Sequence, residues 1–194
     1  MSARDSVAFF GQFLAQPTAI GAVAPSSQSL ASKVVDWIDW PKVRRVVEYG
    51  PGTGVFTERI LCRILPGTRF LAIEANPRLA ATLQRKYPTL SIHADSVRNV
   101  RAICDREGLE EVDAIVCGLP WASYSAGDQR DFLEAMMTVL RPGGSFATFA
   151  YLQGLLLPAG RRFRRGLGDY FTCVERSETS WLNLPPAFVY RCRR

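Results

Sequence analysis

The stretch from residue 46 to residue 54, which reads Val-Val-Glu-Tyr-Gly-Pro-Gly-Thr-Gly, constrains the fold more than any other part of the chain. Two β-branched residues lead into Glu48, glycines then alternate with other residues, and an apolar segment begins at Val55. Glycine accepts a positive φ and lets a ligand approach the backbone. A helix start also offers free N–H groups. The stretch therefore predicts a strand, a ligand-binding turn and a helix.

The spacing within this turn indicates which kind of nucleotide it suits. A dinucleotide fingerprint, G-x-G-x-x-G, holds a pyrophosphate at the helix start. Here the spacing is E-x-G-x-G-x-G, so the Glu48 carboxylate would repel a pyrophosphate and would suit a cationic or amino-bearing ligand. A second acid, Glu74, ends the next predicted strand about 20 residues after the last glycine, where an acid takes ribose hydroxyls. A tight turn without a ligand is the alternative.

This pattern resembles motif I of the class I S-adenosylmethionine-dependent methyltransferases. The resemblance implies an α/β, Rossmann-like, mainly parallel seven-stranded sheet with helices on both faces and an antiparallel last strand. It also implies the cofactor S-adenosyl-L-methionine, with S-adenosyl-L-homocysteine as product, and an acid near the amino acid end of the cofactor. The cofactor-binding residues expected from it are Glu48, Gly50, Gly52, Thr53, Gly54, Glu74, Ala75, Asp95, Ser96, Gly118 and Leu119. Asp95 is expected at the adenine amino group, with a helix cap as its alternative role.

The rest of the chain alternates strands and helices, which predicts an open, mainly parallel sheet covered by helices. Pro41 separates a helical leader, residues 1–40, from a single methyltransferase domain at 41–194. Strands are predicted at 46–49, 69–74, 90–94, 112–117, 145–151, 170–176 and 187–192, and helices at 28–37, 55–65, 77–86, 97–107 and 128–140.

Composition narrows the class of protein further. No apolar run reaches the roughly 18 residues of a membrane span, and the first residues lack a secretory signal. Five cysteines without a C-x-x-C pair and a single histidine argue against structural zinc and a disulfide framework. We therefore expect a cytoplasmic protein without a metal. The net charge of +6 favours an acidic partner such as nucleic acid or anionic lipid, without choosing between them.

A short helix is predicted over residues 5–16. Phe10, Phe13 and Leu14 have the spacing of one helix face. Two interpretations remain open for this helix: a lid packed on the core, or an amphipathic helix in a bilayer interface.

The loop after the fourth strand, Gly118-Leu119-Pro120-Trp121, resembles the N/D-P-P-Y motif of amino-methylating enzymes, with glycine in place of the polar first residue. In those enzymes a side-chain amide or carboxylate and a backbone carbonyl hold the target nitrogen. Trp121 with Tyr124 is predicted to face a cationic or alkylated amine, because an indole face attracts a methylated ammonium. Packing is the alternative for Trp121. Tyr124 and Tyr151 are the candidates for a general base, and the three aromatic residues form the predicted catalytic set.

The chain as a whole resembles bacterial phospholipid N-methyltransferases. The segments that carry this resemblance are the 21–27 turn, the 48–54 loop, the 118–121 loop, the 149–151 strand and the 158–162 run. The resemblance implies methylation of phosphatidylethanolamine or its methylated forms, or of ornithine lipid. Arginines between 161 and 165, interleaved with apolar residues, suit an anionic bilayer and predict a peripheral protein at the inner face of the membrane. The same arginines could also hold nucleic-acid phosphates, which is the less favoured interpretation. Methylation of adenine in rRNA and a membrane-associated, non-catalytic cofactor-binding protein are therefore the two competing functions.

Overall fold

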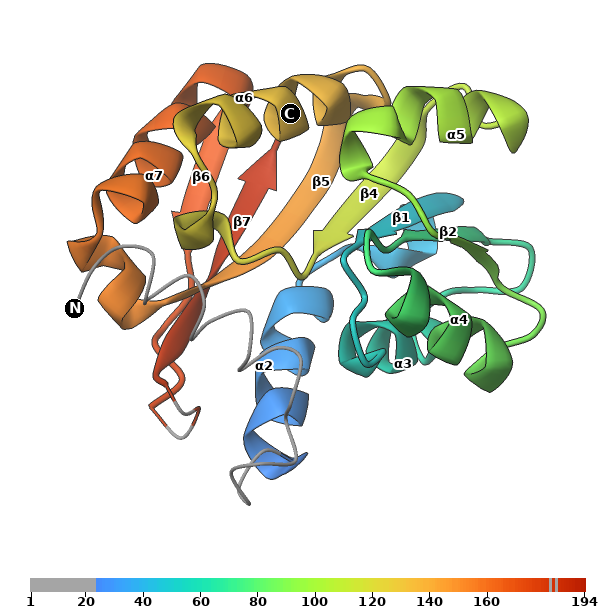
Figure 1. The fold of residues 1–194 in the computed structure, drawn as a ribbon, viewed down its shortest axis with the longest axis horizontal. Coiled ribbons are helices and arrows are strands. Elements are labelled where there is room, and N and C mark those ends of the chain that lie inside the picture. The colour runs from blue at the N-terminus through green and yellow to red at the C-terminus, as the bar shows by residue number, and fades with distance from the viewer. Residues whose placement is uncertain (1–23, 182, 184) are drawn as a thin grey trace.

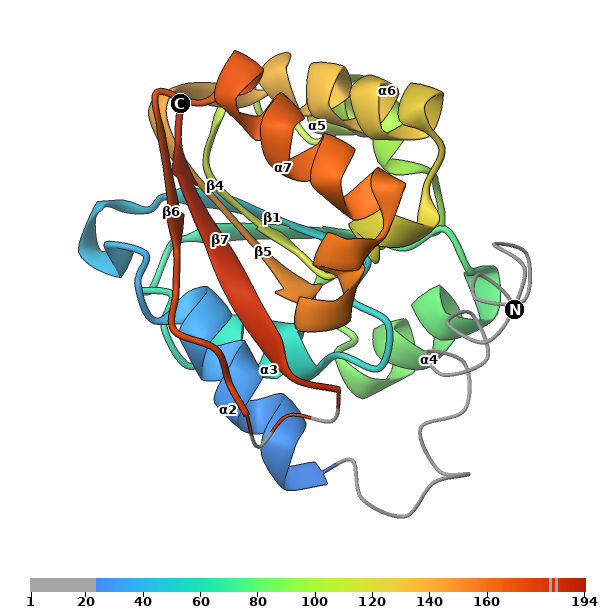
Figure 2. The same ribbon diagram turned by 90° about the vertical axis from the view of Figure 1, so that its left-hand side faces the viewer.

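A computed structural model describes residues 24–181, 183 and 185–194. The helices α2, α3 and α4 cover one face of a seven-stranded sheet, and α5, α6 and α7 cover the other (Figures 1 and 2). The strands are β1 (Arg45–Tyr49), β2 (Arg69–Ile73), β3 (Ser91–His93), β4 (Val112–Cys117), β5 (Leu140–Tyr151), β6 (Cys173–Arg176) and β7 (Ala187–Arg193). The helices are α2 (Ala24–Val35), α3 (Val55–Leu61), α4 (Pro77–Lys86), α5 (Val100–Arg106), α6 (Ala126–Met137) and α7 (Pro158–Tyr170), with 3-10 turns η2 (Trp40–Lys42), η3 (Val97–Asn99), η4 (Trp121–Ser123) and η5 (Leu152–Leu156).

The sheet has the order β3-β2-β1-β4-β5-β7-β6. The first five strands are parallel, and β7 runs antiparallel to both of its neighbours. The order reverses at β1, which pairs with β2 on one side and β4 on the other. Ligands bind outside the carboxyl ends of strands at such a reversal. We call this side of the sheet the carboxyl edge. The predicted fold class is confirmed.

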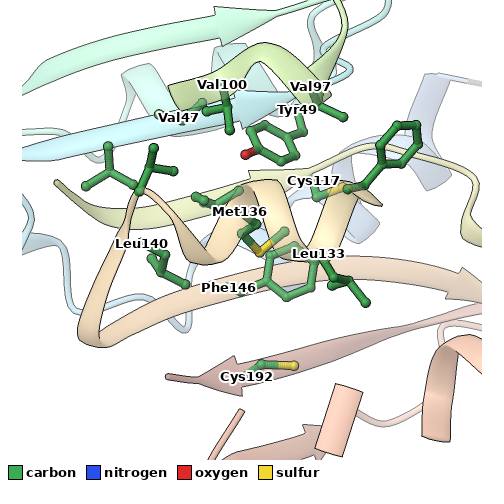
Figure 3. Close-up of a cluster of buried hydrophobic side chains, with 14 of the residues drawn as sticks. Val47, Tyr49, Val97, Val100, Cys117, Leu133, Met136, Leu140, Phe146 and Cys192 are labelled. Carbon is green, nitrogen blue, oxygen red and sulfur yellow. The ribbon is translucent and has the colours of Figure 1, made fainter. Parts of the chain in front are cut away.

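The side chains of β1 alternate between two apolar cores. Val47 and Tyr49 lie in the core beneath α5, α6 and α7, and Figure 3 shows them in the same cluster as Met136 and Phe146. Val46 belongs to the opposite core, beneath α2 and α3. Both faces of the sheet are covered, which explains why its central strands are almost continuously apolar rather than alternating.

Several boundaries differ from the sequence predictions; α3, for example, ends at Leu61 rather than 65. Three of the differences have a structural cause. Helix α6 begins at Ala126 rather than 128, because Ser125 caps it reciprocally with Asp128. The fifth strand, β5, begins at Leu140 rather than 145, so Pro142 and the two glycines after it lie in the strand. Its pairing with β4 shifts register there, which accommodates the extra residues. The sixth strand, β6, is predicted to begin at residue 170. It begins at Cys173, because helix α7 continues to Tyr170.

The basic segment after β5 forms a helix, α7, that sequence reasoning did not assign. Phe163 and Leu167, spaced four residues apart, are buried against the sheet, and the arginines between them are exposed. In the predicted leader, α2 packs into the core beneath the sheet through Leu30 and Val34. The helix predicted at 5–16 lies outside the described residues. No described helix has the length and hydropathy of a membrane span.

Candidate functional site

The glycine turn at the end of β1 adopts a backbone that side chains disfavour. Gly50, Gly52 and Gly54 have φ values of +63°, +56° and +86°. A Cβ added at Gly52 would meet no atom within 4 Å. Gly52 is therefore favoured by its positive φ and not by contact with neighbouring atoms. On this side the turn exposes backbone atoms that no side chain covers. Thr53 beside it is exposed.

Glu48 lies at the base of this turn and is fully buried. Its Oε2 accepts a hydrogen bond from Thr57 Oγ1 at 2.7 Å, whereas its Oε1 has no partner within the described part of the chain. Burial raises the pKa of the Glu48 carboxyl to about 8, against the lowering effect of the Thr57 hydrogen bond, and the nearby Glu74 charge raises it further. A buried oxygen without a partner is costly, so this atom fits a donor that arrives with a ligand.

Glu74, the residue after β2, connects this strand to the glycine turn through hydrogen bonds. Its Oε2 accepts from the Gly52 amide at 3.0 Å and its Oε1 from the Asn76 amide at 2.9 Å. The side chain is 8% exposed. Each carboxylate oxygen keeps a lone pair for a further donor. The structure thus brings together the two acids predicted from the sequence, one below the turn and one beside it. Ala75 follows in an exposed position.

Asp95 and Ser96 follow β3 along the same edge. The Asp95 amide donates to the Glu74 carbonyl at 3.2 Å. Its Oδ1 accepts from Asn99 Nδ2 and the Ser96 amide, each at 2.7 Å, and these bonds, the one from Asn99 first, lower the pKa of the carboxyl. Ser96 Oγ caps η3. The cap residue of η3 is therefore Ser96 and not Asp95, whose carboxylate supports the same turn. The adenine role of Asp95 stays a prediction.

Gly118 packs directly on the glycine turn. Its amide donates to the Tyr49 carbonyl at 2.7 Å, and an added Cβ would stand 2.5 Å from the Gly50 carbonyl oxygen. Leu119 covers the same turn, with Cδ2 2.8 Å from the position of a Cβ on Gly50. The glycine that replaces a polar residue in the loop motif therefore has a steric cause. The turn and the loop leave no room for a side chain at this position.

Trp121 occupies the core rather than the surface. Its ring stacks on Phe163 with centroids 4.2 Å apart and an interplanar angle of 13°, and it is 3% exposed. Its Nε1 donates to Thr148 Oγ1 at 3.0 Å, and that hydroxyl donates to the Cys117 carbonyl. These contacts match the packing alternative. A contact between Trp121 and a substrate stays a prediction.

The two predicted tyrosines lie on opposite faces of the sheet. Tyr124 packs edge-on against Phe132, with centroids 5.0 Å apart, in the core beneath α5 to α7. Tyr151 packs edge-on against Phe149, 5.3 Å away, on the face covered by α2 and α3. Burial raises the pKa of each phenol to about 12. Both are therefore neutral at pH 7 and suited to hydrogen bonding rather than to acting as phenolates.

Sequence reasoning missed Thr57 and Phe56. Thr57 supplies the hydroxyl that holds Glu48, and Phe56 packs edge-on against Phe149 with centroids 5.9 Å apart. The sequence feature that could have identified both residues is their position in the first turn of the helix that follows the glycines. No cluster of three metal-ligating side chains occurs among the described residues.

Comparison with known proteins agrees with this geometry. Residues 46–144 match the family described as a methyltransferase domain. The ornithine lipid N-methyltransferase of Singulisphaera acidiphila is 34% identical over 193 residues, covering 98% of this chain and 96% of that one.

Solved structures share the fold at lower identity. N-methyltransferase NodS from Bradyrhizobium japonicum in complex with S-adenosylhomocysteine has a TM-score of 0.66 and 19% identity, covering 100% of this chain and 99% of that one. An O-methyltransferase from Bacillus cereus, also in complex with S-adenosylhomocysteine, has a TM-score of 0.67 and 15% identity, covering 100% and 91%.

The turn, the paired acids and these matches define an α/β methyltransferase of class I, and the chain belongs to the methyltransferase domain family. It is an enzyme that uses S-adenosyl-L-methionine.

Proposed function

We propose that the protein transfers methyl groups from S-adenosyl-L-methionine to the amine head group of a membrane lipid. The observation that carries this proposal is the match, over nearly the full length of both chains, to a relative named for N-methylation of ornithine lipid. The acceptor is either ornithine lipid, or phosphatidylethanolamine and its methylated forms. The basic helix beside the acceptor end of the sheet supports a lipid rather than a water-soluble amine.

The cofactor end of the proposed site is built from the carboxyl edge of β1, β2 and β3. Glu48 Oε1, buried and without a described partner, suits the ammonium of the methionyl group. Glu74 suits the ribose hydroxyls and Asp95 the adenine amino group. The open side of Gly52 lets the ligand lie against the backbone. When bound, S-adenosyl-L-methionine supplies an electrophilic methyl group that the amine nitrogen takes up.

The acceptor end must present a neutral amine, because an ammonium has no lone pair for attack. Burial in an apolar environment lowers the pKa of an amine, and the aromatic residues around the β4 and β5 ends provide such an environment. Tyr124 follows the turn after β4 and Tyr151 ends β5, so both lie at the carboxyl edge although they pack on opposite faces of the sheet. We propose that they orient the amine from its two sides and that Trp121 supports the loop that carries Gly118. Most of the rate enhancement then comes from holding donor and acceptor at attack distance.

Helix α7 supplies the proposed contact with the membrane. Arg161, Arg162, Arg164 and Arg165 are exposed on it. Each basic residue near an anionic surface contributes about 1 kcal/mol of attraction. The segment predicted as a helix at 5–16 is the second proposed contact. The protein is thus proposed to be peripheral, on the inner face of the membrane.

Incubation with labelled S-adenosylmethionine tests the proposal against its competitors. The acceptors are vesicles that contain phosphatidylethanolamine, vesicles that contain ornithine lipid, and ribosomal RNA. We expect label in a lipid amine. Label only in RNA would reject the lipid assignment in favour of adenine methylation. Cofactor binding without product on any acceptor would favour the non-catalytic alternative.

A further inference from the structure

Exposed apolar side chains gather at the acceptor end of the sheet. The described residues expose five large apolar side chains: Leu65, Leu156, Leu157, Val174 and Trp181. Leu156 is 72% exposed, Trp181 68% and Leu157 39%. These three belong to the two segments that leave the sheet where β5 ends and β7 begins. Single exposed apolar residues are common on proteins, whereas a group marks a contact surface.

Two contacts fix these segments to the same end of the β5–β7 pair. The Leu152 amide, at the start of η5, donates to the Pro186 carbonyl at 2.8 Å. Ser180, the residue before Trp181, bridges to Ala187 at the start of β7. The turn that carries the leucines and the loop that carries the tryptophan therefore both lie at the carboxyl edge. Leu65, in contrast, precedes the start of β2 and lies at the opposite edge.

Cationic side chains flank this apolar group. The Arg161 Nε donates to the Leu155 carbonyl at 3.0 Å, which places a guanidinium next to the exposed leucines. The side chains of Arg162 and Arg165 make no hydrogen bond or ion pair with any other described residue. Together with Arg161, they lie on one open face of α7 that also includes Pro158, Gly166 and Asp169. Apolar and unpaired cationic groups thus occur side by side.

We infer that Leu156, Leu157 and Trp181 form an apolar contact edge that enters the interfacial layer of a bilayer containing anionic lipid. Leucine favours the acyl region, and tryptophan favours the interface, because its ring is apolar and its N–H is polar. The adjoining arginines complement anionic head groups. A bilayer that contains anionic lipid offers apolar chains to the leucines and the tryptophan, and negative head groups to the arginines. The inference rests on the proposed lipid-methylating function and names the surface that serves it.

The position of this edge has a consequence for the reaction. Residues 152–157 directly follow Tyr151, at the end of the strand that borders the proposed acceptor site. Insertion of the edge would turn the carboxyl ends of the strands towards the head groups. A lipid amine would then reach the site while its acyl chains remain in the bilayer.

Vesicle partitioning of the full chain tests the inference. Trp181→Ser, Leu156→Ser and the matched control Leu65→Ser are compared on phosphatidylcholine vesicles with and without phosphatidylglycerol. We expect Trp181→Ser and Leu156→Ser to weaken partitioning about tenfold on both vesicle types. Leu65→Ser should stay within about twofold of the wild type. Arg162→Gln with Arg165→Gln should weaken binding to anionic vesicles only, and high salt should remove that difference.

Binding of S-adenosylhomocysteine by each variant serves as the folding control, and it should stay unchanged. Wild-type-like partitioning of Trp181→Ser and Leu156→Ser would overturn the inference. So would a wild-type dimer that Trp181→Ser dissociates without a change in partitioning, because the edge would then bind a second copy. Failure of the wild type to methylate any lipid amine, despite binding vesicles, would instead overturn the proposed function.

Discussion

The two ends of the site are built in different ways. At the cofactor end, direct hydrogen bonds join the parts: Glu74 accepts from the Gly52 amide, and Thr57 donates to Glu48. At the acceptor end, the predicted residues separate onto opposite faces of the sheet, and one of them is buried. The comparison teaches that the proposed cofactor site is formed by the backbone of the glycine turn and the two acids beside it. The acceptor end depends on how side chains pack across several elements.

Gly118 joins the two ends, and its substitution should have the largest effect. Gly118→Asn restores the polar residue of the amino-methylating motif, but its Cβ would press on the Gly50 carbonyl. A displacement of about 1 Å at a reacting site can cost roughly 100-fold in rate. We therefore expect kcat/KM to fall about 100-fold and S-adenosylhomocysteine affinity to fall with it. Gly166→Ala, at a position without crowding, is the control. An active Gly118→Asn enzyme would break the proposed link between the two ends.

The next largest effect is a pH dependence that belongs to the cofactor end alone. In the free protein, burial raises the pKa of Glu48 to about 8, so the carboxyl is mostly protonated at pH 6. A ligand ammonium favours the carboxylate, so binding below pH 8 must release a proton. We expect S-adenosylhomocysteine affinity to fall roughly tenfold for each pH unit below 8.

Calorimetry at pH 7 in buffers of different ionisation enthalpy measures that proton directly. The wild type should release close to one proton per ligand bound, and Glu48→Gln should release none. Binding heats independent of the buffer in the wild type would mean that Glu48 keeps the same charge in the free and bound states.

Trp121 should affect stability more than substrate binding. Trp121→Phe keeps an aromatic ring against Phe163 but loses the hydrogen bond to Thr148. We expect the free energy of unfolding to fall by about 1 kcal/mol, and by about 3–5 kcal/mol in Trp121→Ala. Denaturant unfolding measures both changes. A large rise in KM for the acceptor without a change in stability would restore a direct role for Trp121 at the substrate.

The smallest expected effect is that of removing either tyrosine hydroxyl. Because both phenols have a pKa near 12, neither supplies a charged base at pH 7. Tyr151→Phe and Tyr124→Phe should each lower kcat by less than about tenfold, the scale of one hydrogen bond. Steady-state kinetics across pH 6–9 measures this. A loss of more than about 100-fold in one variant, recovered at high pH, would identify that tyrosine as a proton acceptor.

Most of the fold was predictable because the hydrophobic period and the turn residues agree. The exception is α7, where Pro158 and three glycines hid the helix. Its 3.6-residue period survives only in Phe163 and Leu167, which pack on the sheet. The early start of α6 follows from a reciprocal cap at Ser125, and such caps are visible in sequence.

The site was predictable to the extent that backbone conformation required it. Three positive φ values require the glycines, and strand ends place Glu48 and Glu74 at one edge. No local pattern reveals that Gly118 contacts Gly50, because 68 residues separate them. The burial of Trp121 by a helix further along the chain was hidden for the same reason.

The central claim is that the glycine turn and its two acids hold the cofactor. Titration of S-adenosylhomocysteine into the wild type and Glu74→Ala, followed by calorimetry, tests it most directly. We predict one ligand per chain for the wild type and at least about tenfold weaker binding for Glu74→Ala, because a carboxylate hydrogen bond is lost. Absence of binding heat in the wild type, or equal affinity in both proteins, would contradict the claim.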